Sequence, residues 1–148
     1  MEFMVRPMTD EQRKAVALEL MLRIDRGEDP LALFDKNARV YFPKWGVANG
    51  HEQIKQLFSD IGTVIQSMSH HHAHFNVLVR DDMVVVEGTS NGTTTDGTEW
   101  RAGVTLAGLW CDVLEIRDHK IQRLYIYLDP DYWSRDTDRY PWLARRKS

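Results

Sequence analysis

The sequence predicts an α+β domain in which helices come first and a curved antiparallel sheet follows. Up to Ser67, most apolar side chains recur at helical spacing, whereas from His70 onward the apolar pattern has a period of two. Short turns at residues 81–82, 96–97 and 118–119 separate the later runs, as in an antiparallel meander. A curved sheet that closes over the helices would leave a cavity between the two layers.

Three helices are predicted before the sheet. The first is expected to begin at Thr9, which can form a capping box with Gln12, and to end at Gly27. A short second helix is expected to start at Asp29-Pro30, a good N-cap and first-turn pair. A third helix is expected over residues 50–67, where apolar residues keep helical spacing. The predicted strands cover residues 38–42, 70–80, 83–94, 99–117 and 120–128.

Composition limits the class of protein. The chain has 148 residues, of which 43% are hydrophobic and 28% charged, so a single domain over residues 1–148 is expected, with residues 130–148 as a C-terminal extension. The formal charge of −3 argues against nucleic acid as a partner. No apolar run reaches the length of a membrane span and no signal peptide is recognisable, so a cytoplasmic location is expected. Cys111 is the only cysteine, which excludes an internal disulfide.

Asp112 is the most informative single residue. In the predicted strand over residues 99–117 the even positions are apolar or glycine, and Asp112 lies among them between Trp110 and Leu114. A carboxyl group on the buried face loses the hydration that its ionised form needs, so its pKa should be raised. Asp112 is therefore a candidate proton donor at neutral pH. The alternative is a structural carboxyl that is hydrogen-bonded to a buried Trp or Tyr.

The order of elements, the segment from Trp110 to Ile121 and the closing Tyr127-Leu128-Asp129-Pro130 resemble the NTF2-like superfamily, particularly its SnoaL-like branch. The resemblance runs from the first helix to about Tyr132. It implies a cone-shaped fold with a deep apolar pocket, commonly as a homodimer. Relatives include polyketide cyclases, ketosteroid isomerase, limonene epoxide hydrolase, dehydratases and non-catalytic domains, so the resemblance fixes the fold more closely than the reaction.

The active sites of these relatives carry over only in part. The run from Asp112 to Ile116 matches the ketosteroid isomerase motif that holds a protonated aspartic acid in the oxyanion hole. The positions that match the isomerase's general base and its oxyanion tyrosine are Phe42 and about Leu20. The aspartate of SnoaL-type cyclases and of the epoxide hydrolase matches Ile126. The resemblance therefore implies a role for Asp112 and leaves the base to come from elsewhere.

The run from His70 to His74 holds four histidines, and on a strand His70, His72 and His74 would share one face. Several SnoaL-like dehydratases pair a histidine on this strand with an aspartate of a neighbouring strand. By that resemblance His72 is the expected base, with His74 next. Two alternatives stay open: these side chains could face solvent or a subunit interface, or they could chelate a metal. No metal and no organic cofactor are expected.

A set of apolar side chains is expected to bind the substrate, although plain core packing is the alternative for each of them. They are Phe42, Trp45, Phe58, Trp110, Leu114 and Ile126. The outer face of the sheet is expected to form a homodimer interface, because its odd positions are rich in apolar residues. These outer residues are Leu109, Cys111, Val113, Tyr125 and Tyr127.

Two functions follow from the sequence. The first is a cofactor-independent isomerase, cyclase or dehydratase that uses Asp112 as acid and His72 or His74 as base on a small hydrophobic oxygenated molecule, such as a polyketide, terpenoid or steroid. The second is a non-catalytic domain of the same fold that binds a small molecule or dimerises. Close approach of His72 and Asp112 in one cavity would favour the first.

Overall fold

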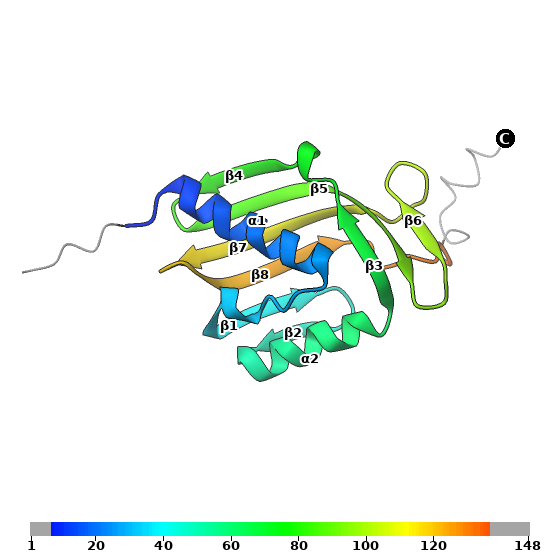
Figure 1. Ribbon diagram of the computed structural model, residues 1–148, viewed down its shortest axis with the longest axis horizontal. Helices are drawn as coiled ribbons and strands as arrows, with labels where there is room; N and C mark the ends of the chain where they lie inside the picture. Colours follow the sequence, from blue (N-terminus) through cyan, green and yellow to red (C-terminus); the bar gives the residue numbers. More distant parts are fainter. Residues whose placement is uncertain (1–6, 137–148) are drawn as a thin grey trace, which may run out of the picture.

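The computed structural model describes residues 7–136 and shows an α+β domain with helices on one face of a curved sheet (Figure 1). Residues 137–148, which include most of the expected C-terminal extension, lie outside the described residues. The helices are α1 (Asp10–Arg26) and α2 (Gly50–Gly62), with 3-10 turns at Leu31–Leu33 and His72–His74. The strands are β1 (Phe34–Phe42), β2 (Gly46–Asn49), β3 (Ile65–His70), β4 (Asn76–Arg80), β5 (Met83–Thr94), β6 (Glu99–Arg101), β7 (Leu109–Arg117) and β8 (Lys120–Leu128).

Helix α1 begins and ends as the sequence predicts. The Gln12 backbone N–H donates to the Thr9 hydroxyl at 3.1 Å, and the Thr9 N–H donates to the Gln12 side chain at 2.9 Å, which completes the capping box. Gly27 ends the helix in the left-handed conformation with φ of 67°. The buried residues Leu20 and Met21 direct one face of α1 toward the sheet.

The two other predicted helices are corrected. The second is only a 3-10 turn, because Phe34 already pairs with Ile121 of β8 and leaves no room for an α-helical turn. The third helix, α2, ends at Gly62 rather than at residue 67. A run of β-branched residues, Thr63-Val64-Ile65, follows it, and Ile65 pairs with Thr94 as the first residue of β3.

The sheet is arranged around β5. Its path is β2-β1-β8-β7-β5-β3, and β4 and β6 also pair with β5. All pairs are antiparallel except β1 with β8, which is parallel. The first half of β5 pairs with β4 and β7, and its second half pairs with β3 and β6. The change of partners along one strand lets β3 turn toward the helices and close one end of the cone (Figure 1).

Two predicted strands are interrupted at the point where β5 changes partners. The predicted strand over residues 70–80 divides into β3 and β4, with the 3-10 turn between them opposite Gly88. A Cβ on Gly88 would lie 2.8 Å from both Phe75 and Trp110, so these two rings fill the space over that glycine. The predicted strand over 99–117 divides into β6 and β7. Its chain re-enters the sheet at Gly108, where φ is 116° and a Cβ would lie 2.7 Å from the Ala102 backbone.

The core lies between the helices and the inner face of the sheet. The even positions of β7 from Trp110 to Ile116 are buried, as the sequence predicts, and Leu114 and Ile116 have no exposed surface. Val104 and Leu106 are exposed, because they lie in the loop between β6 and β7 and not in a strand of the sheet. The even-position pattern therefore holds for β7 and fails for the loop before it.

The outer face of the sheet carries the apolar side chains that the sequence assigns to a homodimer. Leu109 and Tyr127 are 64% and 51% exposed, and Cys111, Val113 and Tyr125 are half-buried. Tyr41 adds to this face, with its ring 5.7 Å from that of Tyr125 and 6.0 Å from that of Tyr127.

We propose that this outer face joins two copies of the chain, because it gathers large apolar side chains, two of them more than half exposed, on one side of the sheet. Sedimentation equilibrium at micromolar concentration should give twice the 17.3 kDa of one chain. Tyr127→Glu should shift the protein to the single-chain mass, since it would bury a charge at the interface. A wild-type protein that shows only the single-chain mass would refute the dimer.

The turn between β7 and β8 holds two residues in the left-handed region, Asp118 with φ of 52° and His119 with φ of 60°. This is the geometry of a two-residue hairpin turn that favours glycine at its second position. His119→Gly should therefore raise the free energy of unfolding by about 1 kcal/mol, as measured by urea denaturation. The contact at 3.2 Å between the His119 backbone N–H and Met8 Sδ does not involve the side chain, so the variant keeps it. Gln122→Gly in β8 is the control and should destabilise the fold; a loss of stability in His119→Gly would mean that the imidazole makes a contact beyond the turn.

Candidate functional site

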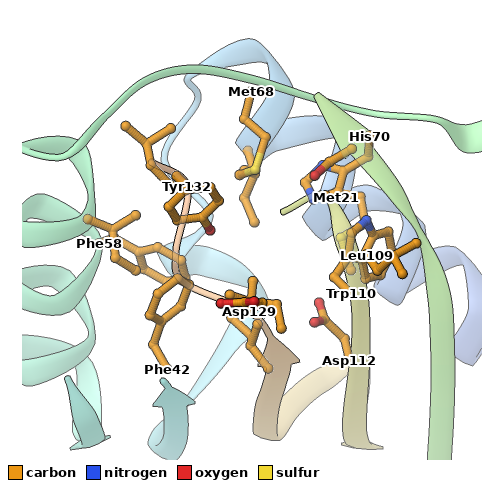
Figure 2. Close-up of a pocket in the computed structure, with 17 residues that line it drawn as sticks. Met21, Phe42, Phe58, Met68, His70, Leu109, Trp110, Asp112, Asp129 and Tyr132 are labelled. Carbon is orange, nitrogen blue, oxygen red and sulfur yellow. The ribbon is translucent and has the colours of Figure 1, made fainter. Parts of the chain in front are cut away.

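An apolar cavity lies between the two helices and the inner face of the sheet (Figure 2). Its wall is formed by α1, α2, β1, β3, β5, β7, β8 and the segments just before β7 and after β8. The residues that line it are Met21, Ile24, Phe42, Phe58, Ile61, Ile65, Met68, His70, Ser90, Gly108, Leu109, Trp110, Asp112, Ile126, Leu128, Asp129 and Tyr132.

Four of the six predicted substrate-binding residues line this cavity: Phe42, Phe58, Trp110 and Ile126. Leu114 does not, because it packs in the core directly below with no exposed surface. Trp45 does not either. It packs edge-on against the outer side of Phe42 at 5.3 Å and faces a separate surface depression.

Asp112 lies on the inner face of β7, where the sequence places it. Its register partners are Val86 on β5 and Ile126 on β8, and only 5% of the residue is exposed. None of the described residues forms a hydrogen bond or ion pair with its carboxyl group. Burial therefore raises the pKa of Asp112 to about 8. Most Asp112 side chains are protonated at neutral pH and can donate a hydrogen bond into the cavity (Figure 2).

The structure does not bring His72 or His74 to Asp112. The β-strand geometry ends at His70, and His72 and His74 lie in the 3-10 turn, so the alternation that would align the three side chains is lost. His74 is exposed, and neither His72 nor His74 lines the cavity. The histidine of this run that lines the cavity is His70.

His70 is held by a carboxylate from α1. Its Nδ1 lies 2.5 Å from Asp25 Oδ1, and its backbone N–H donates to Asp25 Oδ2 at 3.1 Å. His72 Nε2 lies 2.8 Å from the same Oδ2. Burial alone would raise the pKa of Asp25, but the hydrogen bonds from His70 and His72 outweigh it and lower the pKa, so Asp25 is ionised at neutral pH.

The ionised Asp25 decides which nitrogen of His70 is free. A carboxylate can only accept hydrogen bonds, so the proton of a neutral His70 lies on Nδ1. The remaining nitrogen, Nε2, forms no hydrogen bond with any described residue and carries a lone pair. His70 thereby has the arrangement of a general base that is oriented by a partly buried carboxylate.

The register of β5 places His70 and Asp112 on one side of the sheet. His70 pairs with Ser90, Trp110 with Gly88 and Asp112 with Val86, and these three positions of β5 have the same parity. Val86 and Ser90, at the two ends of this series, are four positions apart along β5, which is roughly 13 Å at the rise of a strand. Trp110 lies between the two polar groups (Figure 2). His70 and Asp112 therefore face the same side of the sheet, and both line the cavity.

Asp25 is not among the site residues predicted from the sequence, although its position on α1 is unusual for a carboxylate. Asp25 follows Met21 by four residues and therefore continues the buried stripe of α1. It also lies in the last turn, where the helix dipole disfavours an anion. A carboxylate in such a position needs donors from another element, and these are provided by β3 and by the turn after it.

Neither a metal-ligand cluster nor a membrane-spanning helix is found in the part of the chain that the structure describes. Within residues 7–136, no group of three or more His, Cys, Asp or Glu side chains is arranged to hold a metal ion. None of the helices in the same range is long and apolar enough to cross a membrane.

Comparison with known proteins identifies the fold. The model of the SnoaL-like domain matches residues 24–124. No curated protein sequence matches the chain. An NTF2-like protein of unknown function from Burkholderia pseudomallei superimposes with a TM-score of 0.70 at 18% identity, over 86% of this chain and 97% of that one. A protein from Xanthomonas campestris that is provisionally named a polyketide cyclase gives 0.70 at 12% identity, over 83% and 94%.

A further similar structure, from Bacillus subtilis and provisionally named an isomerase, has a TM-score of 0.68 and 19% identity, over 88% of this chain and 96% of that one. At these identities the similarity shows the NTF2-like fold, and the reaction has to be argued from the residues of the cavity.

The protonation of Asp112 should be visible in the stability of the protein. In the unfolded chain this carboxyl ionises near 3.8, whereas in the folded protein its pKa is about 8. At a pH between these two pKa values, unfolding therefore releases a proton from Asp112. The folded protein becomes less stable as the pH rises through this range. Asp112→Asn lacks this loss and should be more stable than wild type at pH 7, by up to roughly 4 kcal/mol.

Urea denaturation of both proteins between pH 4 and pH 8 measures this difference. The difference in the free energy of unfolding between Asp112→Asn and wild type should be small near pH 4 and should widen toward pH 8. Two curves that stay parallel over the whole range would show that Asp112 is ionised in the folded protein.

Proposed function

Because this chain belongs to the SnoaL-like domain family, we propose that it is a cofactor-independent enzyme that moves a proton on a small hydrophobic oxygenated molecule, and so catalyses isomerisation or dehydration next to a carbonyl group. His70 is the proposed base, Asp25 positions it, and Asp112 is the proposed acid. The observation that carries this proposal is the presence in one apolar cavity of an imidazole oriented by a carboxylate and a carboxyl that burial keeps protonated.

The first step follows from the two protonation states. The His70 Nε2 lone pair takes a proton from the carbon next to the substrate carbonyl, and the electrons of the C–H bond move onto the carbonyl oxygen. The Asp112 O–H donates a hydrogen bond to that oxygen and stabilises the developing negative charge. The imidazolium that forms is stabilised by the Asp25 carboxylate at 2.5 Å.

Two outcomes of this step balance. In an isomerisation, the imidazolium returns the proton to a different carbon of the same molecule. In a dehydration, a hydroxyl group on the next carbon leaves with the proton of the imidazolium, so water and an unsaturated product result and both side chains return to their starting protonation states. Neither outcome requires a metal or an organic cofactor, because the protein side chains hold and move the proton.

The apolar wall supports this assignment over the mechanisms of the named relatives. Phe42 and Ile126 line the cavity where the isomerase base and the cyclase acid would be, and Leu20 is fully buried in the core. Within the described residues His70 is the one imidazole in the cavity wall. The second reading, a domain that only binds its ligand, does not require an oriented imidazole in the wall, whereas Asp25 holds the His70 ring through Nδ1 at 2.5 Å.

Exchange of carbon-bound protons tests the chemistry without knowledge of the natural substrate. Wild-type protein in D₂O should accelerate deuterium incorporation next to the carbonyl of 1-tetralone, followed by ¹H NMR. His70→Gln and Asp112→Asn should each lower the catalysed rate by about 100-fold or more. Asp25→Asn should lower it less, since the base is kept but loses its fixed orientation.

His74→Gln is the matched control, because it changes an exposed histidine of the same run and should exchange at the wild-type rate. The proposal fails if wild type exchanges 1-tetralone and its open-chain analogues no faster than buffer, or if His70→Gln is as active as wild type.

A further inference from the structure

Tyr132 reaches the cavity from the segment that follows β8. Its ring packs against Trp100 with a centroid distance of 4.6 Å, in a cluster that also includes Ala107. Its backbone N–H donates to the Pro130 carbonyl at 2.9 Å. The side chain lines the same cavity as His70 and Asp112, and in Figure 2 it lies across the cavity from Trp110 with its hydroxyl directed inward.

The Tyr132 hydroxyl is buried without a partner. The residue is 5% exposed, and its oxygen forms no hydrogen bond with any described residue. A buried hydroxyl that lacks a partner is destabilising, and a phenylalanine would make the same ring contacts without this cost. Packing in the free protein therefore accounts for an aromatic ring at position 132, but it does not account for the hydroxyl group.

The Tyr132 hydroxyl keeps its proton and can therefore donate a hydrogen bond. Burial, together with the charge of nearby Asp129, raises the pKa of Tyr132 to about 12, so the phenol is neutral at physiological pH. Asp129, which also lines the cavity, accepts the Asp131 backbone N–H at 2.9 Å and forms no hydrogen bond with the Tyr132 hydroxyl. An oxygen atom of a bound molecule is therefore an acceptor that could satisfy this hydroxyl.

The segment that carries Tyr132 is fastened to the rest of the domain. The Trp133 indole N–H donates to Asp96 Oδ2 at 2.9 Å, in the turn between β5 and β6. Hydrogen bonds from the Thr94 hydroxyl and from Thr98, together with this one, lower the pKa of Asp96 to about 2. Asp131 accepts the backbone N–H groups of residues 135 and 136 at 3.0 and 2.9 Å. These contacts hold the Tyr132 hydroxyl in place before a ligand arrives, which lowers the entropy cost of binding.

We propose that the Tyr132 hydroxyl donates a hydrogen bond to an oxygen of the bound molecule and so positions it between His70 and Asp112. The ligand class that fits is a compact apolar ring skeleton with two oxygen functions. One is the carbonyl that faces Asp112, and the other is an acceptor on the side of the cavity formed by the segment after β8. This inference rests on the proposed function for the placement of the carbonyl, and it adds a positioning residue and the second oxygen.

Binding without turnover tests this inference separately from the chemistry. Isothermal titration calorimetry would compare three probes with a common skeleton and two, one or no oxygen functions: 6-hydroxy-1-tetralone, 1-tetralone and tetralin. The Tyr132→Phe variant removes only the hydroxyl and should weaken binding of 6-hydroxy-1-tetralone at least five-fold. It should change the affinity for tetralin less than two-fold. The control Tyr127→Phe removes the same atom from the outer face and should leave all three affinities unchanged.

Thermal unfolding of the free proteins adds a measurement that does not depend on a ligand. Tyr132→Phe should melt at the same temperature as wild type or higher, because it removes an unpaired buried hydroxyl. A lower melting temperature would mean that the hydroxyl has a partner in the free protein, and this would overturn the inference.

Equal loss of affinity for all three probes would also overturn it, because it would assign Tyr132 to packing alone. So would unchanged affinity for 6-hydroxy-1-tetralone, or failure of this probe to bind wild type at millimolar concentration. None of these results requires turnover. Proton exchange that still depends on His70 and Asp112 would leave the proposed function in place while the role of Tyr132 is rejected.

Discussion

Strand β5 determines the geometry of the domain, because four other strands pair with it. Its first half belongs to the main sheet and its second half carries β3 toward the helices. The change of partners falls between Glu87 and Asn91, and at Gly88 in this stretch the rings of Phe75 and Trp110 occupy the space that a side chain would fill. The same strand places the partners of His70, Trp110 and Asp112 at positions of one parity, so the curvature that creates the cavity also directs its polar groups inward.

The two carboxyl groups that matter to the site have opposite protonation states for physical reasons that can be separated. Asp112 is surrounded by apolar side chains and no described donor reaches it, so burial raises its pKa and the group is neutral. Asp25 is partly buried as well, but three hydrogen bonds from His70 and His72 lower its pKa and keep it ionised. The difference provides one acid and one positioned base within a single cavity. Neither group would have this property if the two environments were exchanged.

The catalytic roles proposed for this chain fall partly on other residues than those that the family resemblance implies. Phe42 and Ile126 form part of the apolar wall, and the polar groups of the proposed site come from α1, β3, β7 and the segment after β8. Asp25, His70 and Tyr132 lie far apart in the chain and meet only around the cavity.

The sequence by itself determined the features that depend on local spacing. The capping box of α1, the hairpin turns, the long strands β5 and β8 and the burial of Asp112 on β7 all follow from periodicity and turn residues. The choice of His70 over His72 depended on where β3 ends, and that is decided by pairing with β5 rather than by local propensity. The hydrogen bonds of Asp25 and the position of Tyr132 join segments distant in the chain. Only the tertiary structure could place them, because contacts between distant segments leave no periodic signal in the sequence.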